Sequence, residues 1–191
     1  MSSKSKFPVS SALFTGHMID LPDRAVLRFP AVLEHAAGRA IRAKIAHVQA
    51  QANGPLTGYA SGARGGDILF HEACRSLGIA TVMVLPFAPE IFALGSVAGI
   101  PGSDWVARFW ALWNGTASEH RINLDLPDRD DAYGVCNDEM LARAQRHGSF
   151  HLIALWNGQG GDGEGGAADL VAKARATGDN PDIIDPGTLQ A

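Results

Sequence analysis

Residues 58–72 read GYASGARGGDILFHE, with four glycines in the first nine positions. The stretch overlaps a short apolar run, LTGYA (56–60), which predicts a strand. It then leads into DILFHEACRSLG (67–78), which we predict to be a helix because Asp67 is a favourable N-cap residue and Gly78 a favourable C′ residue. A strand, a glycine-rich turn and a helix in this order are typical of an α/β fold.

Predicted strands and helices alternate along the rest of the chain. Apolar runs predict strands at 10–16, 56–60, 80–87, 120–126, 150–158 and 181–186. Helical spacing and capping residues predict helices at 31–51, 67–78, 88–99, 103–115, within 128–148 and at 167–178. This order predicts an α/β fold, a single doubly wound domain whose mostly parallel sheet of about five to six strands has helices on both faces. We expect the domain to span residues 1–191, with residues 1–9 flexible.

The composition favours a globular protein that does not grip DNA. Of the 191 residues, 46% are hydrophobic and 19% are charged, and the formal net charge is -4. This charge predicts neither a basic surface for DNA nor an anchor for an anionic membrane. The two cysteines, Cys74 and Cys136, form no CxxC pair and no disulfide framework, so we expect a reduced, cytoplasmic setting.

No apolar segment predicts a membrane anchor. The lysines of MSSKSKFPVS (1–10) are not followed by the apolar region of a signal peptide. Residues 82–100 form the longest apolar stretch, but Pro86, Pro89 and Glu90 interrupt it. We therefore expect a buried strand, a turn and a helix there instead of a membrane span.

A second glycine cluster, GQGGDGEGG (158–166), also follows a predicted strand and precedes a predicted helix. In doubly wound sheets, ligands bind beyond the carboxyl ends of the strands, where helix N-termini present unpaired N–H groups. The first cluster, 61–66, has the spacing neither of a GxGxxG dinucleotide motif nor of a P-loop. The first cluster is therefore either a phosphate- or ribose-binding turn or a plain strand-to-helix turn, and the second is either a phosphate-binding loop or a solvent-exposed one.

The candidate ligand-binding residues come from the two clusters and from the end of the first strand. They are Gly16, His17, Ser61, Gly62, Arg64, Gly65, Gly66, Asp67, Asn157, Gly158, Gly160, Gly161, Asp162, Gly165 and Gly166. Arg64 can pair with a phosphate or lie on the surface. Asp162 and Glu164 can accept ribose hydroxyls or face solvent.

Two carboxylates are candidate catalytic residues. Glu72 lies about a turn and a half into the helix after Asp67 and can act as nucleophile or base on an N-glycosidic bond, or lie on the helix surface. Asp67 can be a helix cap, a ribose ligand or a catalytic acid. No zinc motif or GxSxG elbow is present. The acidic residues between 125 and 131 make a divalent metal possible, but we predict no metal site and no required cofactor beyond a nucleotide ligand.

SGARGGDILFHEAC (61–74) followed by RSLGIATVMVLPF (75–87) resembles the core of the SLOG superfamily of Rossmann-like nucleotide-binding domains. DNA processing protein A, a member, has a stretch of the form SG-x-A-x-GID-x-x-AH. The matching residues here are Ser61, Gly62, Gly66, Asp67 and His71. Thr15-Gly16 resembles the family's first ligand-facing loop, and ALWNGQGGDGEGGAADLVAKA (154–174) resembles its late strand and phosphate-binding turn.

The resemblance implies a domain that binds a nucleotide or an NAD-derived nucleotide as a sensing or signalling module. Such a module can report to a partner or to a second copy of itself, so a homodimer or higher oligomer is possible. The alternative is an N-glycosidic-bond hydrolase or transferase with Glu72 as its catalytic carboxylate. The phosphoribohydrolases of the superfamily carry PGGxGTxxE, whereas here Gly65-Gly66-Asp67 has no following Gly-Thr. A third interpretation is a structural subunit whose glycines only form turns.

Overall fold

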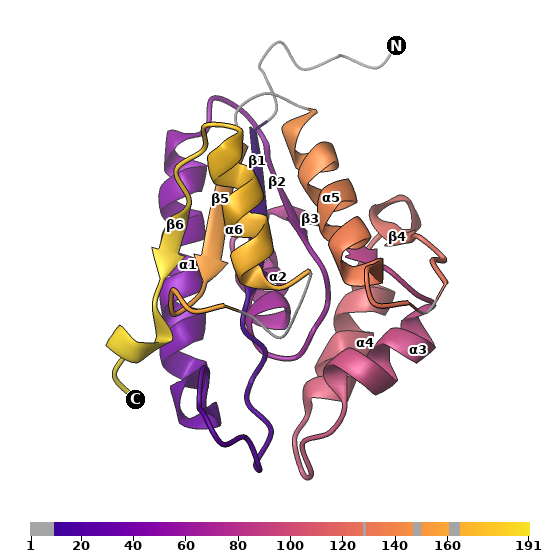
Figure 1. Ribbon diagram of the computed structural model, residues 1–191. Helices are drawn as coiled ribbons and strands as arrows, with labels where there is room; N and C mark the ends of the chain where they lie inside the picture. The colour runs from indigo at the N-terminus through magenta and orange to yellow at the C-terminus, as the bar shows by residue number, and fades with distance from the viewer. Residues whose placement is uncertain (1–9, 128, 147–149, 161–164) are drawn as a thin grey trace.

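Six parallel strands form one sheet in the order β4-β3-β2-β1-β5-β6 (Figure 1). The computed structural model describes residues 10–127, 129–146, 150–160 and 165–191, so the prediction for residues 1–9 lies outside it. The strands are β1 (Ser10–Gly16), β2 (Leu56–Ala60), β3 (Ala80–Leu85), β4 (Arg121–Asn123), β5 (Phe150–Leu155) and β6 (Asp182–Ile184). The predicted α/β fold is confirmed, and the sheet is parallel throughout these strands.

Helices cover both faces of the sheet (Figure 1). The helices are α1 (Glu34–Gln51), α2 (Gly66–Ser76), α3 (Pro89–Phe92), α4 (Trp105–Gly115), α5 (Ala132–Gln145) and α6 (Ala167–Ala176). Short turns complete the elements: η1 (Ala31–Leu33), η2 (Ala93–Val97), η3 (Ser118–His120) and η4 (Pro186–Thr188). The apolar sides of α1, α2 and α4 pack on one face, and those of α5 and α6 pack on the other.

The central strand β1 is buried on both faces, which explains its continuous apolar run. Ala12 and Phe14 belong to the core cluster with α1 and α2, whereas Leu13 belongs to the cluster with α5 and α6. From β1 the chain builds β2, β3 and β4 on one side and then β5 and β6 on the other. The strand order therefore reverses between β1 and β5, and a crevice is expected beyond their carboxyl ends.

The predicted element boundaries differ from the observed ones mainly between residues 88 and 105. The predicted helix 88–99 is instead the four-residue α3 followed by η2, a single turn of π-helix. Ser103 does not cap α4, because its hydroxyl donates to the carbonyl of Ile100, and the helix begins only at Trp105. No helix in the described part of the chain is long and apolar enough to cross a membrane.

The first glycine cluster contains a close backbone crossing. Met18 and Gly65 form an isolated antiparallel bridge, and the N–H of Ile19 donates to the carbonyl of Arg64 at 3.3 Å. Gly65 has φ +94°, and a Cβ built there would lie 2.5 Å from the nitrogen of Ile19. Position 65 therefore requires glycine for both its backbone conformation and the approach of the two segments.

Replacing Gly65 with alanine should lower the free energy of unfolding by at least about 2 kcal/mol, because positive φ is unfavourable for an L side chain and the two backbones must also separate. Gly78→Ala is the matched control: Gly78 has φ +69°, but nothing lies within 4 Å of its Cβ position. It should cost only about 1 kcal/mol. Urea unfolding followed by circular dichroism measures both losses, and equal losses would contradict the role of the crossing.

Candidate functional site

A cavity of about 290 Å³ lies at the carboxyl edge of the sheet, where the strand order reverses between β1 and β5. Its walls come from the end of β1 and the following loop, the start of α2, the α3–η2 segment, α5 and the start of α6. The lining residues are Phe14, Thr15, Gly16, His17, Met18, Arg28, Ser61, Ala63, Asp67, Phe92, Gly95, Ser96, Tyr133, Cys136, Asn137, Met140, Trp156, Gly165, Gly166, Ala167 and Ala168. Both glycine clusters thus reach one site, but they contribute differently.

In the first cluster, the glycines serve packing and do not form the cavity wall. A Cβ at Gly62 would lie 2.9 Å from the ring of Phe109, and one at Gly66 would lie 3.0 Å from the ring of Phe14. The N–H of Gly66 donates to the carbonyl of His17 at 3.2 Å. Of the residues predicted from this cluster, Ser61 and Asp67 line the cavity, whereas Gly62, Gly65 and Gly66 do not.

Arg64 lies inside the protein, so its predicted surface alternative is wrong. The residue is only 5% exposed, and its guanidinium donates to the carbonyls of Ile19 (3.3 Å) and Ala98 (2.9 Å). Arg64 is not among the cavity-lining residues. Its side chain joins the loop after β1 to the segment after η2, which is a structural role.

The second glycine cluster does reach the cavity, through the start of α6. Gly165 has φ +89°, and a Cβ there would lie 2.5 Å from the Cβ of Tyr133, so the loop passes directly against α5. The side-chain amide of Asn137 donates to the carbonyl of Gly165 at 2.8 Å. Gly166 precedes the first residue of α6, and Ala167 and Ala168 line the cavity after it. The N-terminus of a ten-residue helix therefore opens on the site.

The remaining residues predicted from the second cluster either do not line the cavity or lie outside the residues that the structure describes. Gly158 and Gly160 are not lining residues, and nothing lies within 4 Å of a Cβ at either position. Gly161 and Asp162, with Glu164, lie outside the described residues. Trp156 lines the cavity, and its indole N–H donates to the carbonyl of Gln159 at 2.7 Å.

His17 and Asn157 tie the ends of β1 and β5 together. His17 is 7% exposed and lines the cavity, and its Nε2 lies 3.0 Å from Oδ1 of Asn157. The same oxygen accepts the N–H of Gln159 at 3.1 Å. Burial lowers the pKa of His17, although the hydrogen bond to Asn157 opposes the shift. The imidazole is therefore neutral near neutral pH, and Asn157 orients it from outside the cavity wall.

Asp67 is a buried carboxyl group in the cavity wall. It is not the N-cap of α2 as predicted, because Gly65, with its positive φ, takes that position and the helix begins at Gly66. The Asp67 carboxylate accepts the N–H of Ala63 at 3.1 Å. Burial raises the pKa of Asp67 to about 7, and that hydrogen bond only partly offsets the rise. An acid whose pKa lies near 7 in a cavity can donate or accept a proton at physiological pH.

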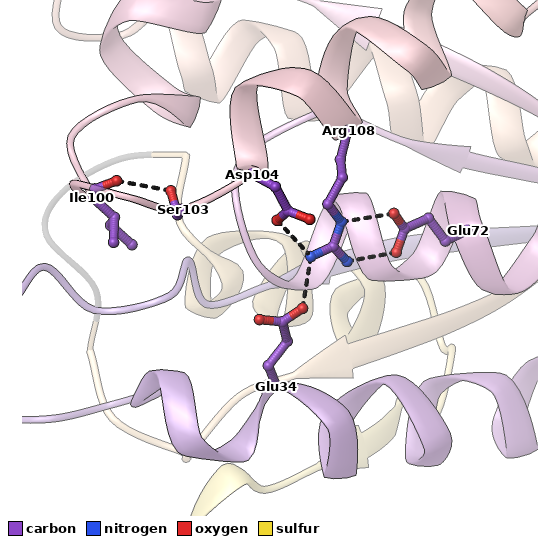
Figure 2. Close-up of polar contacts among 6 residues, drawn as sticks. All are labelled: Glu34, Glu72, Ile100, Ser103, Asp104 and Arg108. Carbon is purple, nitrogen blue, oxygen red and sulfur yellow. Dashed lines mark hydrogen bonds and ion pairs between the residues drawn. The ribbon is translucent and has the colours of Figure 1, made fainter.

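Glu72 lies outside this cavity, in an ion-pair cluster that joins three helices (Figure 2). Arg108 of α4 donates to both carboxylate oxygens of Glu72, at 2.8 and 2.6 Å, and to Glu34 at 2.6 Å. The guanidinium also stacks 4.1 Å from the ring centre of Trp105. Burial alone would lower the pKa of Arg108, but the hydrogen bonds and charges of Glu72 and Glu34 raise it. This geometry gives Glu72 a structural partner and no access to the proposed ligand.

The last residue of the matched motif, His71, is also internal. It is 1% exposed, and its Nε2 lies 2.8 Å from the carbonyl oxygen of Ser61. Burial lowers its pKa to about 4, so the ring is neutral and holds the end of the β2 loop in place.

The sequence analysis missed several cavity residues, and Arg28 matters most because it is the one Arg or Lys among the described lining residues. It is half-buried in the loop between β1 and α1, and its backbone N–H donates to the carboxylate of Asp20 at 2.8 Å. Tyr133, Cys136 and Asn137 come from α5. Only the three- and four-residue spacing of these α5 residues could have placed them on one helix face.

No metal site is visible in the part of the chain that the structure describes. There, no group of three or more His, Cys, Asp or Glu side chains could hold an ion. In the acidic loop, Asp131 pairs with Arg129 at 2.6 Å, and Asp128 lies outside the described residues.

Neither a family model nor a curated protein matches the sequence. Among solved structures, TM1055, a structural genomics target, matches with a TM-score of 0.47 and 14% identity over 90% of this chain and 72% of that chain. DNA processing protein A from Streptococcus pneumoniae matches with a TM-score of 0.40 and 12% identity over 97% of this chain and 63% of that chain. Streptococcus suis SuiB bound to S-adenosylmethionine matches with a TM-score of 0.32 and 12% identity over 93% of this chain and 39% of that chain.

This chain spans less than two thirds of DNA processing protein A and of SuiB. All three TM-scores lie below 0.5, so these likenesses carry no argument about function.

Asp67→Asn should remove a pH dependence of stability. Because the folded pKa of about 7 lies above the ordinary value of 3.8, folding favours the protonated carboxyl. The resulting stabilisation is complete below about pH 4 and is lost as the pH rises to about 7. The difference in free energy of unfolding between wild type and Asp67→Asn should therefore change over that range by an amount on the order of a few kcal/mol.

Urea unfolding across a pH series measures this difference. His71 acts in the opposite sense, because its lowered pKa removes stability as the pH falls from 6.5 to about 4. Since both proteins contain His71, its contribution cancels in the comparison. A difference that stays constant from pH 4 to pH 7 would contradict the titration of Asp67.

Proposed function

We propose that the cavity binds a nucleotide or an NAD-derived nucleotide, and that the chain is a ligand-sensing or signalling domain of the cytoplasm. The observation that carries the proposal is that the N-terminus of α6 and the side chain of Arg28 share one cavity at the strand-order reversal. A helix N-terminus and a guanidinium both favour a phosphate group. Gly166, Ala167 and Ala168 provide the backbone at that position.

The rest of the wall suits a base and a sugar. Phe14, Phe92 and Trp156 supply aromatic surface against which a planar base can stack, and Met140 adds apolar surface. Asp67 and Ser61 supply polar groups for sugar hydroxyls. The volume of about 290 Å³ is at the lower end of small-molecule pockets, which supports a ligand of one nucleotide unit inside the cavity.

A second candidate function, cleavage or transfer at an N-glycosidic bond, is favoured by one observation. Asp67 is a cavity-lining carboxyl whose pKa of about 7 suits a general acid. In this alternative Asp67, and not Glu72, protonates the leaving base, because Glu72 is paired with Arg108 outside the cavity.

The experiment that tests the proposal uses purified full chain with a panel of nucleotides, cyclic nucleotides, NAD and ADP-ribose. Mass spectrometry measures both the retained compound and any free base. Retention of an intact compound supports the sensing domain, and base release supports the second candidate. If nothing in the panel is retained or cleaved, the proposed function is wrong for these ligands.

Arg28→Gln should weaken binding of the retained compound about tenfold or more, because a hydrogen bond to a charged group contributes about 1.5–3 kcal/mol. Arg39→Gln is the control, since Arg39 is exposed on α1 and the charge change is the same. Isothermal titration calorimetry compares the two variants with wild type. Equal affinities for both variants would show that Arg28 does not contact the ligand.

Glu72→Gln should lower the free energy of unfolding by about 1 kcal/mol, because it breaks a partly exposed bidentate pair while Glu34 remains on Arg108. It should leave ligand affinity and any base release unchanged. Asp67→Asn, in contrast, should reduce base release if cleavage occurs. Loss of base release in Glu72→Gln with normal stability would restore Glu72 as the catalytic carboxylate.

A further inference from the structure

The cavity has exposed residues at its rim and buried residues inside. Met18 and Tyr133 are each 38% exposed although both line the cavity. Cys136, which also lines it, is only 2% exposed. Tyr133 and Cys136 are three residues apart on α5, so they share a face of the helix, and Tyr133 is the one nearer to solvent.

A hydrogen bond crosses the rim between α5 and η2. The hydroxyl of Tyr133 lies 2.9 Å from Oγ of Ser96, and either oxygen can donate. Both residues line the cavity, and Ser96 is 5% exposed. The backbone at Gly95 also lies beside the phenol, since a Cβ there would be in ordinary van der Waals contact, 3.9 Å, with the Tyr133 oxygen.

The two hydroxyls belong to different segments, Ser96 to η2 and Tyr133 to α5, and each segment has its own contacts with the rest of the protein. On one side, the carbonyl of Ser96 accepts the N–H of Arg64 at 3.0 Å, which joins η2 to the first glycine cluster. On the other side, the ring of Tyr133 makes an edge contact with Phe87 at 5.6 Å, and its backbone packs against Gly165 of the second cluster. The hydroxyl pair therefore connects η2 with α5 across the rim, and each of these segments contacts one of the two clusters.

We propose that Ser96 and Tyr133 form a gate, which admits a ligand when their hydrogen bond breaks and the Tyr133 side chain turns toward solvent. A single hydrogen bond between neutral hydroxyls contributes little net stability, so it can break without unfolding η2 or α5. Rotation about the side-chain torsions of Tyr133 needs no movement of α5. The gate regulates the cavity assigned above and in that sense rests on the proposed function.

Thiol labelling tests the gate without any ligand. Cys136 lies in the cavity wall, whereas Cys74 is fully buried in the other core cluster. Burial raises the pKa of each thiol to about 12, so both are expected to react slowly until they become exposed. N-ethylmaleimide labelling, read peptide by peptide by mass spectrometry, then reports gate opening at Cys136 and global unfolding at Cys74.

Tyr133→Phe and Ser96→Ala should each accelerate Cys136 labelling about fivefold, the factor that corresponds to loss of a typical net hydrogen bond, and leave Cys74 labelling unchanged. Cys136 in the double variant should be labelled no faster than in either single variant, since all three variants remove the same Ser96–Tyr133 hydrogen bond. Tyr59→Phe is the matched control, because Tyr59 packs in the same core cluster as Cys136 but does not line the cavity.

An unchanged Cys136 rate, or equal acceleration of Cys136 and Cys74, would overturn the gate. Acceleration by Tyr59→Phe to the same extent would also overturn it, because general loosening of the core would then explain the result. If the nucleotide panel fails while the labelling pattern appears as expected, the gate stands and the ligand class is wrong.

Discussion

The backbone crossing at Gly65 is the contact on which the rest of the site depends. Met18 and Gly65 pair there in an antiparallel bridge, beside a sheet whose strands are all parallel. The bridge fixes the loop after β1 against the start of α2, so that His17 and Asp67 line one cavity although they follow different strands. Arg64 extends the junction to the segment after η2 through its bond to the carbonyl of Ala98. Glycine at 65 therefore positions side chains that it does not touch.

Burial of Asp67 reduces the repulsion between its carboxyl group and the phosphate that we propose for this cavity. With its pKa raised by burial to about 7, Asp67 carries less negative charge at neutral pH than an ordinary aspartate, which would repel a phosphate. A bound anion would raise that pKa further, so ligand binding and proton uptake are expected to be coupled. Burial lowers the pKa of His17, which favours the neutral imidazole. Arg28 and the N-terminus of α6 then supply the positive potential.

The fold could be predicted from the sequence because strands buried on both faces leave continuous apolar runs. The bounds of β1 and β2 agree with the prediction, and Gly78, with φ +69°, follows the end of α2 as expected. The site was harder to predict, since glycines that serve packing and glycines that face a ligand look the same in a sequence. Gly62 faces Phe109, which is distant in the chain, and this contact is visible only after folding. Arg28 lies in a loop without a motif, so no local pattern marks it.

Helix geometry explains why Asp67 and Glu72 cannot serve one site, and this much follows from their spacing. Five residues correspond to about 500° of rotation, so the two carboxylates point about 140° apart around α2. Once the backbone crossing at Gly65 turns Asp67 toward the cavity, Glu72 faces away from it, toward α4, where Arg108 donates a hydrogen bond to its carboxylate. His71, four residues from Asp67, stays within about 40° of it and remains close enough to bind the Ser61 carbonyl at the end of β2. The position of Asp67 on α2 therefore turns Glu72 away from the cavity, so of these two carboxylates only Asp67 can take part in chemistry there.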